Sequence, residues 1–188
     1  MTHIKTYLEE TKRIADSIRV TDIERLVDEL CALRDRFGRL YIAGLGGSAA
    51  NASHAANDFR KLCGIDAHCL TDNVASVTAR ANDLGWDKCL DLDFAGERDA
   101  ILVLSVGGGS AGVSVPLIVA AIGIAKLGGT LLGIVGRDGG YIGENAKVSV
   151  IVPTVSELRV TPHTEGWQSI VLHCLVSHPR LQVSPTKW

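Results

Sequence analysis

The chain has 188 residues, of which 46% are hydrophobic, and a formal net charge of −2. A chain of this length can bury one good hydrophobic core, so one domain spanning 1–188 is expected. The charge leaves no basic field for nucleic acid, and the lysines and arginines are scattered, so a nucleic-acid partner is disfavoured.

The cysteines and the N-terminal segment predict a cytoplasmic protein. The five cysteines form no Cys-x-x-Cys pair, and an odd number of thiols within mostly apolar segments is typical of a reducing compartment. The segment through Arg19 is charged throughout, and no stretch offers about 18 uncharged apolar residues. We therefore expect a soluble protein without a membrane partner.

Two amphipathic helices are expected at the start of the chain. In the second, Thr21 is a candidate N-cap, because apolar residues recur behind it at helical spacing. These residues are Ile23, Leu26, Val27, Leu30 and Leu33.

From residue 40 onward, apolar strands alternate with helices. Strands are predicted at 40–43, 67–70, 100–105, 130–135 and 148–152, and helices at 48–62, 75–81, 111–127, 141–146 and about 164–176. Continuous apolar runs such as Ile101 to Leu104 require cover on both faces of a sheet. The pattern therefore predicts a doubly wound α/β fold, in which ligands bind beyond the carboxyl ends of the strands.

Two glycine–serine loops follow predicted strands and lead into predicted helices. The first is Gly44-Leu45-Gly46-Gly47-Ser48, and the second runs from Ser105 through Gly107 to Ser110. Free backbone N–H groups at a helix start favour an anion, so the pair of loops predicts a phosphate site. The alternative is that each loop is only a tight turn that needs glycine. A nucleotide site is disfavoured, because neither the P-loop nor the full dinucleotide spacing is present.

Histidines and carboxylates form a second candidate group. His54 and Asp58 share one face of the helix that leaves the first loop, and Glu165, Gln168 and His173 lie on the last predicted helix. Two histidines with two carboxylates suit a zinc-type ion. Apolar neighbours predict a partly buried His173, for which a hydrogen-bonded core role is the alternative. The remaining histidines are interpreted as surface or loop residues: His3, His68, His163 and His178.

These motifs resemble the sugar isomerase (SIS) domain family, and within it the phosphoheptose isomerase branch. The resemblance covers nearly the whole chain. It depends on the first loop with His54 six positions on, Thr71-Asp72-Asn73 with Asn82-Asp83, the second loop, the segment 130–140 ending in Gly-Arg-Asp-Gly-Gly, and the last helix with His173.

The resemblance implies a flavodoxin-like fold with a five-stranded parallel sheet, and a homotetramer with active sites between subunits. It implies helices for oligomer packing at 1–37, a sugar-phosphate-binding core at 38–178 and a tail at 179–188. The implied activity is interconversion of an aldose phosphate and a ketose phosphate, as by sedoheptulose 7-phosphate isomerases.

The resemblance also assigns roles to individual residues. The expected zinc ligands are His54, Asp58, Glu165 and His173, and the expected catalytic residues are Asp58, His173 and Glu165. The expected substrate-binding residues are Gly46, Gly47, Ser48, Asn82, Asp83, Ser105, Gly107 and Ser110.

The chain departs from the family pattern in both loops. Leu45 stands where the family has asparagine, and Ser105-Val106-Gly107-Gly108-Gly109-Ser110 replaces Ser-Thr-Ser-Gly-Asn-Ser. Sugar recognition is therefore expected to differ. The alternative function is a non-catalytic SIS protein that senses a sugar phosphate or bridges protein partners.

Helix geometry adds one further expectation. Glu165 and His173 are eight residues apart, about 12 Å along a helix, which strains their joint binding of one ion. Either the start of this helix is irregular or a second subunit completes the site. Asp58 is the first choice of base, with Glu165 as the alternative and His173 as the acid.

Overall fold

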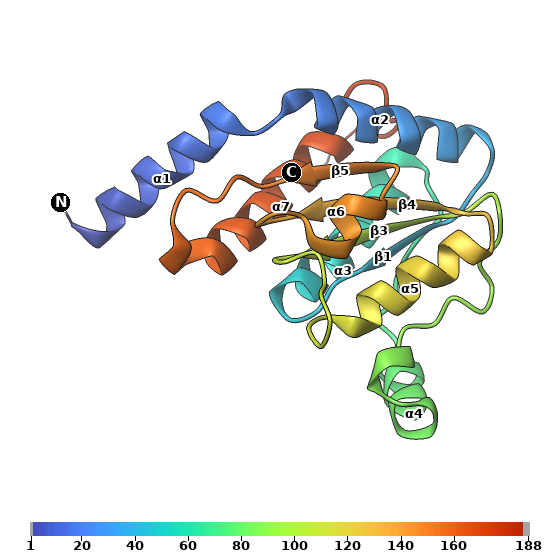
Figure 1. Cartoon of the computed structure of the whole chain (residues 1–188). Helices are drawn as coiled ribbons and strands as arrows, with labels where there is room; N and C mark the ends of the chain where they lie inside the picture. Colours follow the sequence, from blue (N-terminus) through green and yellow to red (C-terminus); the bar gives the residue numbers. More distant parts are fainter. Residues whose placement is uncertain (1, 186–188) are drawn as a thin grey trace.

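A computed structural model describes residues 2–185 (Figure 1). The strands are β1 (Leu40–Ala43), β2 (Ala67–Cys69), β3 (Ala100–Ser105), β4 (Thr130–Val135) and β5 (Val148–Ile151). The helices are α1 (His3–Ser17), α2 (Val20–Asp35), α3 (Gly47–Cys63), α4 (Val74–Leu84), α5 (Val115–Lys126), α6 (Gly140–Asn145) and α7 (Val160–Val176), with short 3₁₀ turns η1 (Trp86–Lys88) and η2 (Glu157–Arg159).

The five strands form one sheet in the order β2-β1-β3-β4-β5. Every neighbouring pair is parallel, with Leu40 opposite Ala67 and Ala100, and Ala100 opposite Thr130. This is the flavodoxin-like strand order, in which the chain reverses direction of winding at β1 and β3. The predicted five-stranded doubly wound fold is confirmed.

Alternate strand residues bury opposite faces of the sheet. Ile42 and Leu102 pack with α2, α3 and α7, whereas Ile101 and Val103 pack with α5 and α6. Because both faces are covered, the strands can be apolar at every position. The carboxyl ends of β1 and β3 thus lie side by side at one edge of the sheet, and both glycine–serine loops begin there.

The N-terminal helices differ from the expectation in one detail. Helix α2 begins at Val20, and its N-cap is Arg19, which makes no side-chain capping bond. The prediction of Thr21 as N-cap is wrong, because Thr21 already lies inside the first turn. The buried Asp22 in that turn instead pairs with Arg19, at 2.9 Å, and a carboxylate there complements the helix dipole.

A buried polar cluster holds α1, which projects from the body in Figure 1. Glu10 accepts hydrogen bonds from Arg159 at 2.6 and 2.7 Å and lies 2.8 Å from His163 Nε2. His163 is 4% exposed and stacks on Tyr7, so its assignment as a surface or loop residue is wrong. An isolated histidine carries no sequence signal for a carboxylate partner more than 150 positions away.

Two helices begin about four residues away from their predicted starts. Helix α5 begins at Val115, four residues late, because Gly109 and Gly112 adopt positive φ angles and keep the preceding segment a loop. Helix α7 begins at Val160, and Pro162 fits in its first turn, where a missing N–H costs nothing.

The last described residues pack against the core. Leu181 is fully buried, and its carbonyl accepts a hydrogen bond from Arg34 at 2.9 Å. All five cysteines are free thiols, and only Cys174 is exposed. Burial raises the pKa of the Cys63 thiol to about 12. Within residues 2–185, no helix is both long enough and apolar enough to cross a membrane.

Candidate active site

The first glycine–serine loop is shaped by close backbone approaches. A Cβ on Gly44 would collide with the backbone of Ser48, and Gly46 has a φ of +60° as the N-cap of α3. Both positions therefore require glycine. The loop turns directly from β1 into α3, so the unpaired N–H groups of the first helical turn lie at the carboxyl edge of the sheet.

The second loop packs against the turn that follows β4. Gly108 has a φ of +67°, and a Cβ there would collide with the backbone of Gly139. The carbonyls of Gly108 and Gly109 accept from Ile142 and Tyr141, both at 3.0 Å. Ser105 Oγ accepts from Gly108 N at 3.1 Å. The loop is thus fixed from both sides.

A cavity of about 220 Å³ lies between the two loops. Its polar lining comes from Ser48, Ser105, Gly107, Ser114 and Arg137, and its apolar lining from Leu45, Leu104, Val106, Val113 and Leu117. The fold therefore brings three predicted substrate-binding residues to one small cavity: Ser48, Ser105 and Gly107. Sequence reasoning missed Ser114 and Arg137.

Ser110 does not line this cavity. It is exposed and forms an isolated backbone bridge with Val113, whereas Ser114 lines the cavity at the N-cap of α5. The start of α5 has a signal in the sequence, because proline is favoured at the first helical positions, where Pro116 lies, and serine, here Ser114, is a preferred N-cap residue. Within one chain, Ser114 therefore lines the cavity wall and Ser110 does not, and the role of Ser110 in substrate binding remains a prediction.

His54, Asp58 and His173 come together on α3 and α7. His54 Nε2 lies 3.2 Å from both Asp58 Oδ2 and His173 Nε2, and one ligand atom from each residue lies within 4.8 Å of the other two. Ligands around a tetrahedral zinc ion at about 2.0–2.1 Å are separated by roughly 3.3 Å. The group could therefore hold a metal ion, with a coordination position left open as in catalytic zinc sites.

His173 is exposed, and the prediction that it is partly buried is wrong. Its neighbours Val171, Leu172 and Leu175 face the core. Because successive helical residues are rotated by about 100°, His173 is turned away from that face and toward α3. Its other ring nitrogen, Nδ1, lies 3.5 Å from Ser169 Oγ, which supports the ring from behind.

Glu165 lies elsewhere within the single chain. Its carboxylate lies so close to Gly47 that a Cβ there would meet it at 2.6 Å. Both Glu165 and His173 are on the uninterrupted helix α7, so the alternative of an irregular helix start is wrong. Completion of the metal site by a second subunit remains a prediction.

A buried amide connects the two helices directly behind the first loop. Gln168 is fully buried, and its Oε1 accepts from Ser48 Oγ at 3.0 Å and from Asn51 Nδ2 at 3.2 Å. Asn51 also donates to the Glu165 carbonyl at 2.9 Å. Asn51 was missed by sequence reasoning, although it is the polar residue one turn beyond Ser48 on α3. This network holds α7 against α3. It therefore also fixes the relative positions of His54, Asp58 and His173, which these two helices carry.

Asn82 and Asp83 are exposed on α4, which buries none of its residues and stands away from the sheet in Figure 1. Asn82 Nδ2 donates to Asp83 Oδ1 at 2.7 Å. Within one chain these two residues are not brought to the cavity, so their role in substrate binding remains a prediction.

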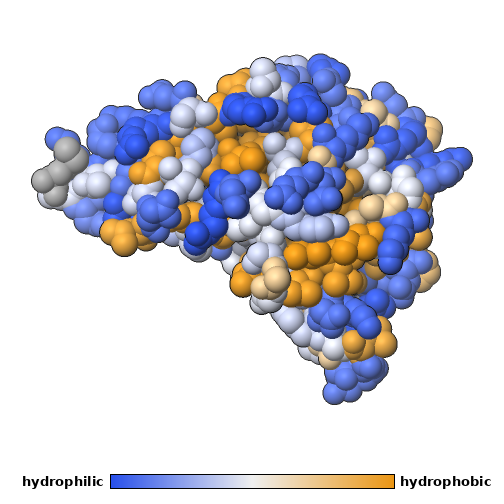
Figure 2. Space-filling view, in the orientation of Figure 1, coloured by the Kyte–Doolittle hydropathy of each residue, from blue (hydrophilic) through white to orange (hydrophobic). Residues whose placement is uncertain are grey.

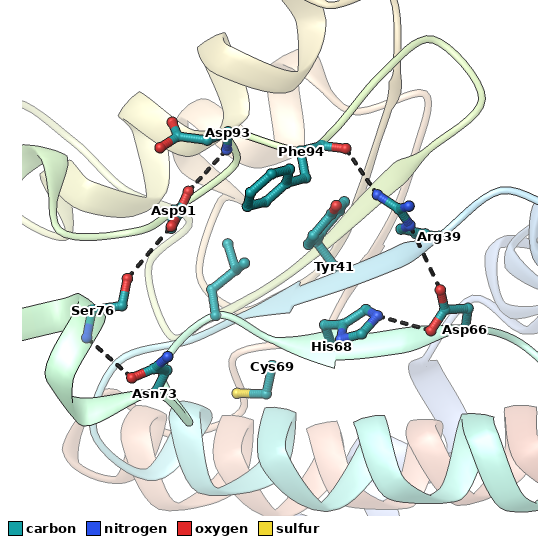
Figure 3. Close-up of a pocket in the computed structure, with 11 residues that line it drawn as sticks. Arg39, Tyr41, Asp66, His68, Cys69, Asn73, Ser76, Asp91, Asp93 and Phe94 are labelled. Carbon is teal, nitrogen blue, oxygen red and sulfur yellow. Dashed lines mark hydrogen bonds and ion pairs between the residues drawn. The ribbon is translucent and has the colours of Figure 1, made fainter.

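A second cavity, of about 400 Å³, opens on the sheet face opposite α3 (Figure 3). It contains none of the predicted site residues. Its polar groups are occupied with each other: Asp66 pairs with His68 at 2.8 Å, and Arg39 donates to the Phe94 carbonyl at 3.0 Å. The smaller cavity is the better candidate, because its donors lie at the carboxyl edge of the sheet.

The chain is similar to known proteins over most of its length. A phosphoheptose isomerase from Syntrophotalea carbinolica is 31% identical over 183 residues, which cover 90% of this chain and 88% of that protein. The structure of phosphoheptose isomerase from Neisseria gonorrhoeae superposes with a TM-score of 0.78 at 25% identity, over 92% of this chain and 94% of that one. The enzyme from Francisella tularensis gives 0.81 at 20% identity, over 94% and 97%. No protein-family model matches.

The parallel sheet with two glycine–serine loops at its carboxyl edge thus defines a sugar isomerase (SIS) domain. Within that class, the chain belongs to the phosphoheptose isomerase family. It is homologous to enzymes that interconvert aldoses and ketoses.

Proposed function

We propose that the protein is an aldose–ketose isomerase acting on a sugar phosphate similar to sedoheptulose 7-phosphate. One helix, α3, joins both parts of the site. It begins at the cavity with Ser48 and bears His54 six residues later, a rise of about 9 Å. The five carbon–carbon bonds from C2 to C7 of a heptulose, at about 1.5 Å each, have a span of the same order.

The phosphate would bind in the cavity between the loops, and the carbonyl end would reach His54, Asp58 and His173. Ser105 and the N–H groups at the start of α3 are the donors for the phosphate. When bound at the His–Asp–His group, a zinc ion would polarise the sugar carbonyl. The hydrogen bonds from Ser48 and Asn51 to Gln168 hold the two helices that carry these ligands.

The reaction needs a base and an acid. Asp58 removes the proton from the carbon beside the carbonyl with the carboxylate oxygen that does not ligate the ion, and the carbonyl oxygen takes a proton, which gives an enediol. His173 donates this proton where its Nε2 does not ligate the ion. A proton then adds to the former carbonyl carbon, and the hydroxyl on the carbon that was first deprotonated loses its proton, which completes the transfer with no net change in atoms or electrons. If a second subunit brings Glu165 to the sugar, Glu165 can serve as the base instead.

Hydrogen exchange tests this proposal. The zinc-loaded protein is incubated with sedoheptulose 7-phosphate in deuterated water, and deuterium at the carbon beside the carbonyl is measured by mass spectrometry. We expect exchange in the wild type, its loss in Asp58→Asn, and its retention in Glu165→Gln. Asp93→Asn, an exposed carboxylate outside the site, is the matched control and is expected to exchange normally.

Other outcomes would change the assignment of the base or contradict the enzyme proposal. Loss of exchange in Glu165→Gln alone would make Glu165 the base. Zinc content is measured in each variant, so that loss of the metal is separated from loss of the base. Binding of several sugar phosphates without any exchange would contradict the enzyme proposal and favour the sensor, for which the altered second loop is the supporting observation.

A further inference from the structure

Arg137 is the distinctive residue of the cavity between the loops. It follows β4 in the Gly136-Arg137-Asp138-Gly139 turn. Among the described residues that line the cavity, it alone carries a charge. A phosphate group brings up to two negative charges into this space, and the chain as a whole has a net charge of −2. Attraction of phosphate therefore depends on a local cation.

The guanidinium is not committed to any other group. Arg137 makes no hydrogen bond or ion pair with another side chain in residues 2–185. The adjacent carboxylate does not neutralise it, because Asp138 Oδ1 accepts from Gly140 N at 3.2 Å. The five donors of Arg137 are thus available to a ligand.

The second loop leaves room for this side chain. A Cβ on Gly107 would lie 3.5 Å from Arg137 Cδ and 3.9 Å from Nε, so the arginine packs over the bare glycine backbone. The same loop offers few other donors, because Val106 and the three glycines after it carry no polar side-chain group. Ser48 Oγ is already used as a donor to Gln168.

The backbone is also unusual at this position. Only three described non-glycine residues have positive φ angles, and two of them, Ser114 and Arg137, line this one cavity. Arg137 has a φ of +52°. A side chain in this region is disfavoured over glycine, and such strained residues gather at functional sites. Glycine would adopt this positive φ angle with less strain than arginine. The stability of the fold therefore does not account for an arginine at this position.

We propose that Arg137 is a specificity-determining residue that binds the phosphate group of the substrate through charge-assisted hydrogen bonds. This inference rests on the proposed function only in one respect, namely that the phosphate belongs to a sugar phosphate. Arginine suits the task because its planar fork can hold two phosphate oxygens at once.

Calorimetric binding of inorganic phosphate to the full chain tests the inference. We expect Arg137→Gln to weaken phosphate binding at least tenfold and Arg137→Lys to retain part of the affinity. Arg98→Gln changes the net charge by the same amount at an exposed position outside this cavity, and is expected to bind within twofold of the wild type. Equal affinities of Arg137→Gln and Arg98→Gln would overturn the proposal.

A glycine variant separates binding from folding. Arg137→Gly relieves the positive φ, so its thermal midpoint should equal or exceed that of the wild type while phosphate binding is lost. Full phosphate affinity in this variant would also contradict the inference. With sedoheptulose 7-phosphate, the KM should rise at least tenfold in Arg137→Gln, and kcat should change less. If no sugar phosphate is turned over, the proposed function fails, whereas an Arg137-dependent phosphate affinity still supports the inference.

Discussion

Ser110 and Ser114 are four positions apart in the chain, and only Ser114 lines the cavity between the loops. The side chain of Ser114 makes no capping bond to α5, whereas Ser110 is exposed outside the cavity. We therefore predict that Ser114→Gly weakens binding of inorganic phosphate about tenfold, the size of one lost hydrogen bond to a charged group. Glycine also tolerates the φ of +56° at this position.

Ser110→Gly is the matched control for this prediction. It also removes one hydroxyl from the same loop, and it should leave phosphate affinity within twofold of the wild type. Isothermal titration calorimetry measures both variants. A larger effect at Ser110 would return the phosphate contact to the serine that the sequence resemblance indicates.

The two histidines of the candidate metal group give a second prediction at the scale of single residues. Removing one of three ligands weakens zinc binding strongly, so His54→Ala and His173→Ala should each lower bound zinc from about one ion per chain to well below one. Equilibrium dialysis followed by metal analysis measures this content. His68→Ala is the control, because His68 is an exposed histidine beside a carboxylate in the other cavity. Unchanged zinc in the first two variants would remove the group as a metal site.

At the scale of elements, α1 depends on one buried carboxylate. Hydrogen bonds from Arg159 and His163 lower the pKa of Glu10 from 4.5 to about 2. A lowered pKa means that Glu10 stabilises the folded state fully above its unfolded pKa, and that this stabilisation is lost as the pH falls from about 4.5 toward 2. Protonation of Glu10 is therefore expected to weaken the packing of α1 against the rest of the protein at low pH.

We predict that Glu10→Gln lowers the free energy of unfolding at pH 7, and that its difference from the wild type narrows as the pH falls below about 4.5. Denaturant unfolding at several pH values measures this difference. Glu9→Gln is the control, because Glu9 forms an exposed ion pair with Lys12 on α1, and its substitution should have a small effect at every pH. A difference for Glu10→Gln that stays constant with pH would contradict the assignment.

The surface of the protein has an apolar region over α5 (Figure 2). Helix α5 is apolar around most of its circumference. Ile122 on this helix is 36% exposed, and Leu127 at its C-cap is 44% exposed. Below it, α4 has no buried residue, and Trp86, in the η1 turn that follows α4, is 56% exposed. Apolar surface of this kind is typical of an interface between subunits.

We predict that the protein is a homotetramer and that α5 contributes to its interfaces. Ile122→Glu should shift the assembly to smaller species, because a carboxylate cannot be buried unpaired in an apolar contact. Analytical ultracentrifugation measures the mass. Lys61→Glu introduces the same charged group at an exposed position on α3 and should leave the assembly intact. A wild type that sediments as a monomer would contradict this prediction, and with it the completion of the site by a second subunit.

The sequence alone determined the elements that depend on local patterns. The strands at 40–43, 100–105 and 130–135 match the predicted ranges, because continuous apolar runs bounded by glycine have few other interpretations. The pairing of His54 with Asp58 was also predictable, since residues four apart share a helix face. The same holds for the position of Ser48 and Ser105 at the carboxyl edge of the sheet.

Contacts between segments that are distant in the sequence could not be predicted from local patterns. The packing of α3 against α7 places His173 beside His54 and Glu165 beside Gly47. The hydrophobic periodicity of the two helices does not predict these neighbours. The fold of three separate loops brings Ser114 and Arg137 to the walls of one cavity and leaves Ser110 outside it. Periodicity specifies which face of an element a side chain occupies, whereas its neighbours are set by how the elements pack.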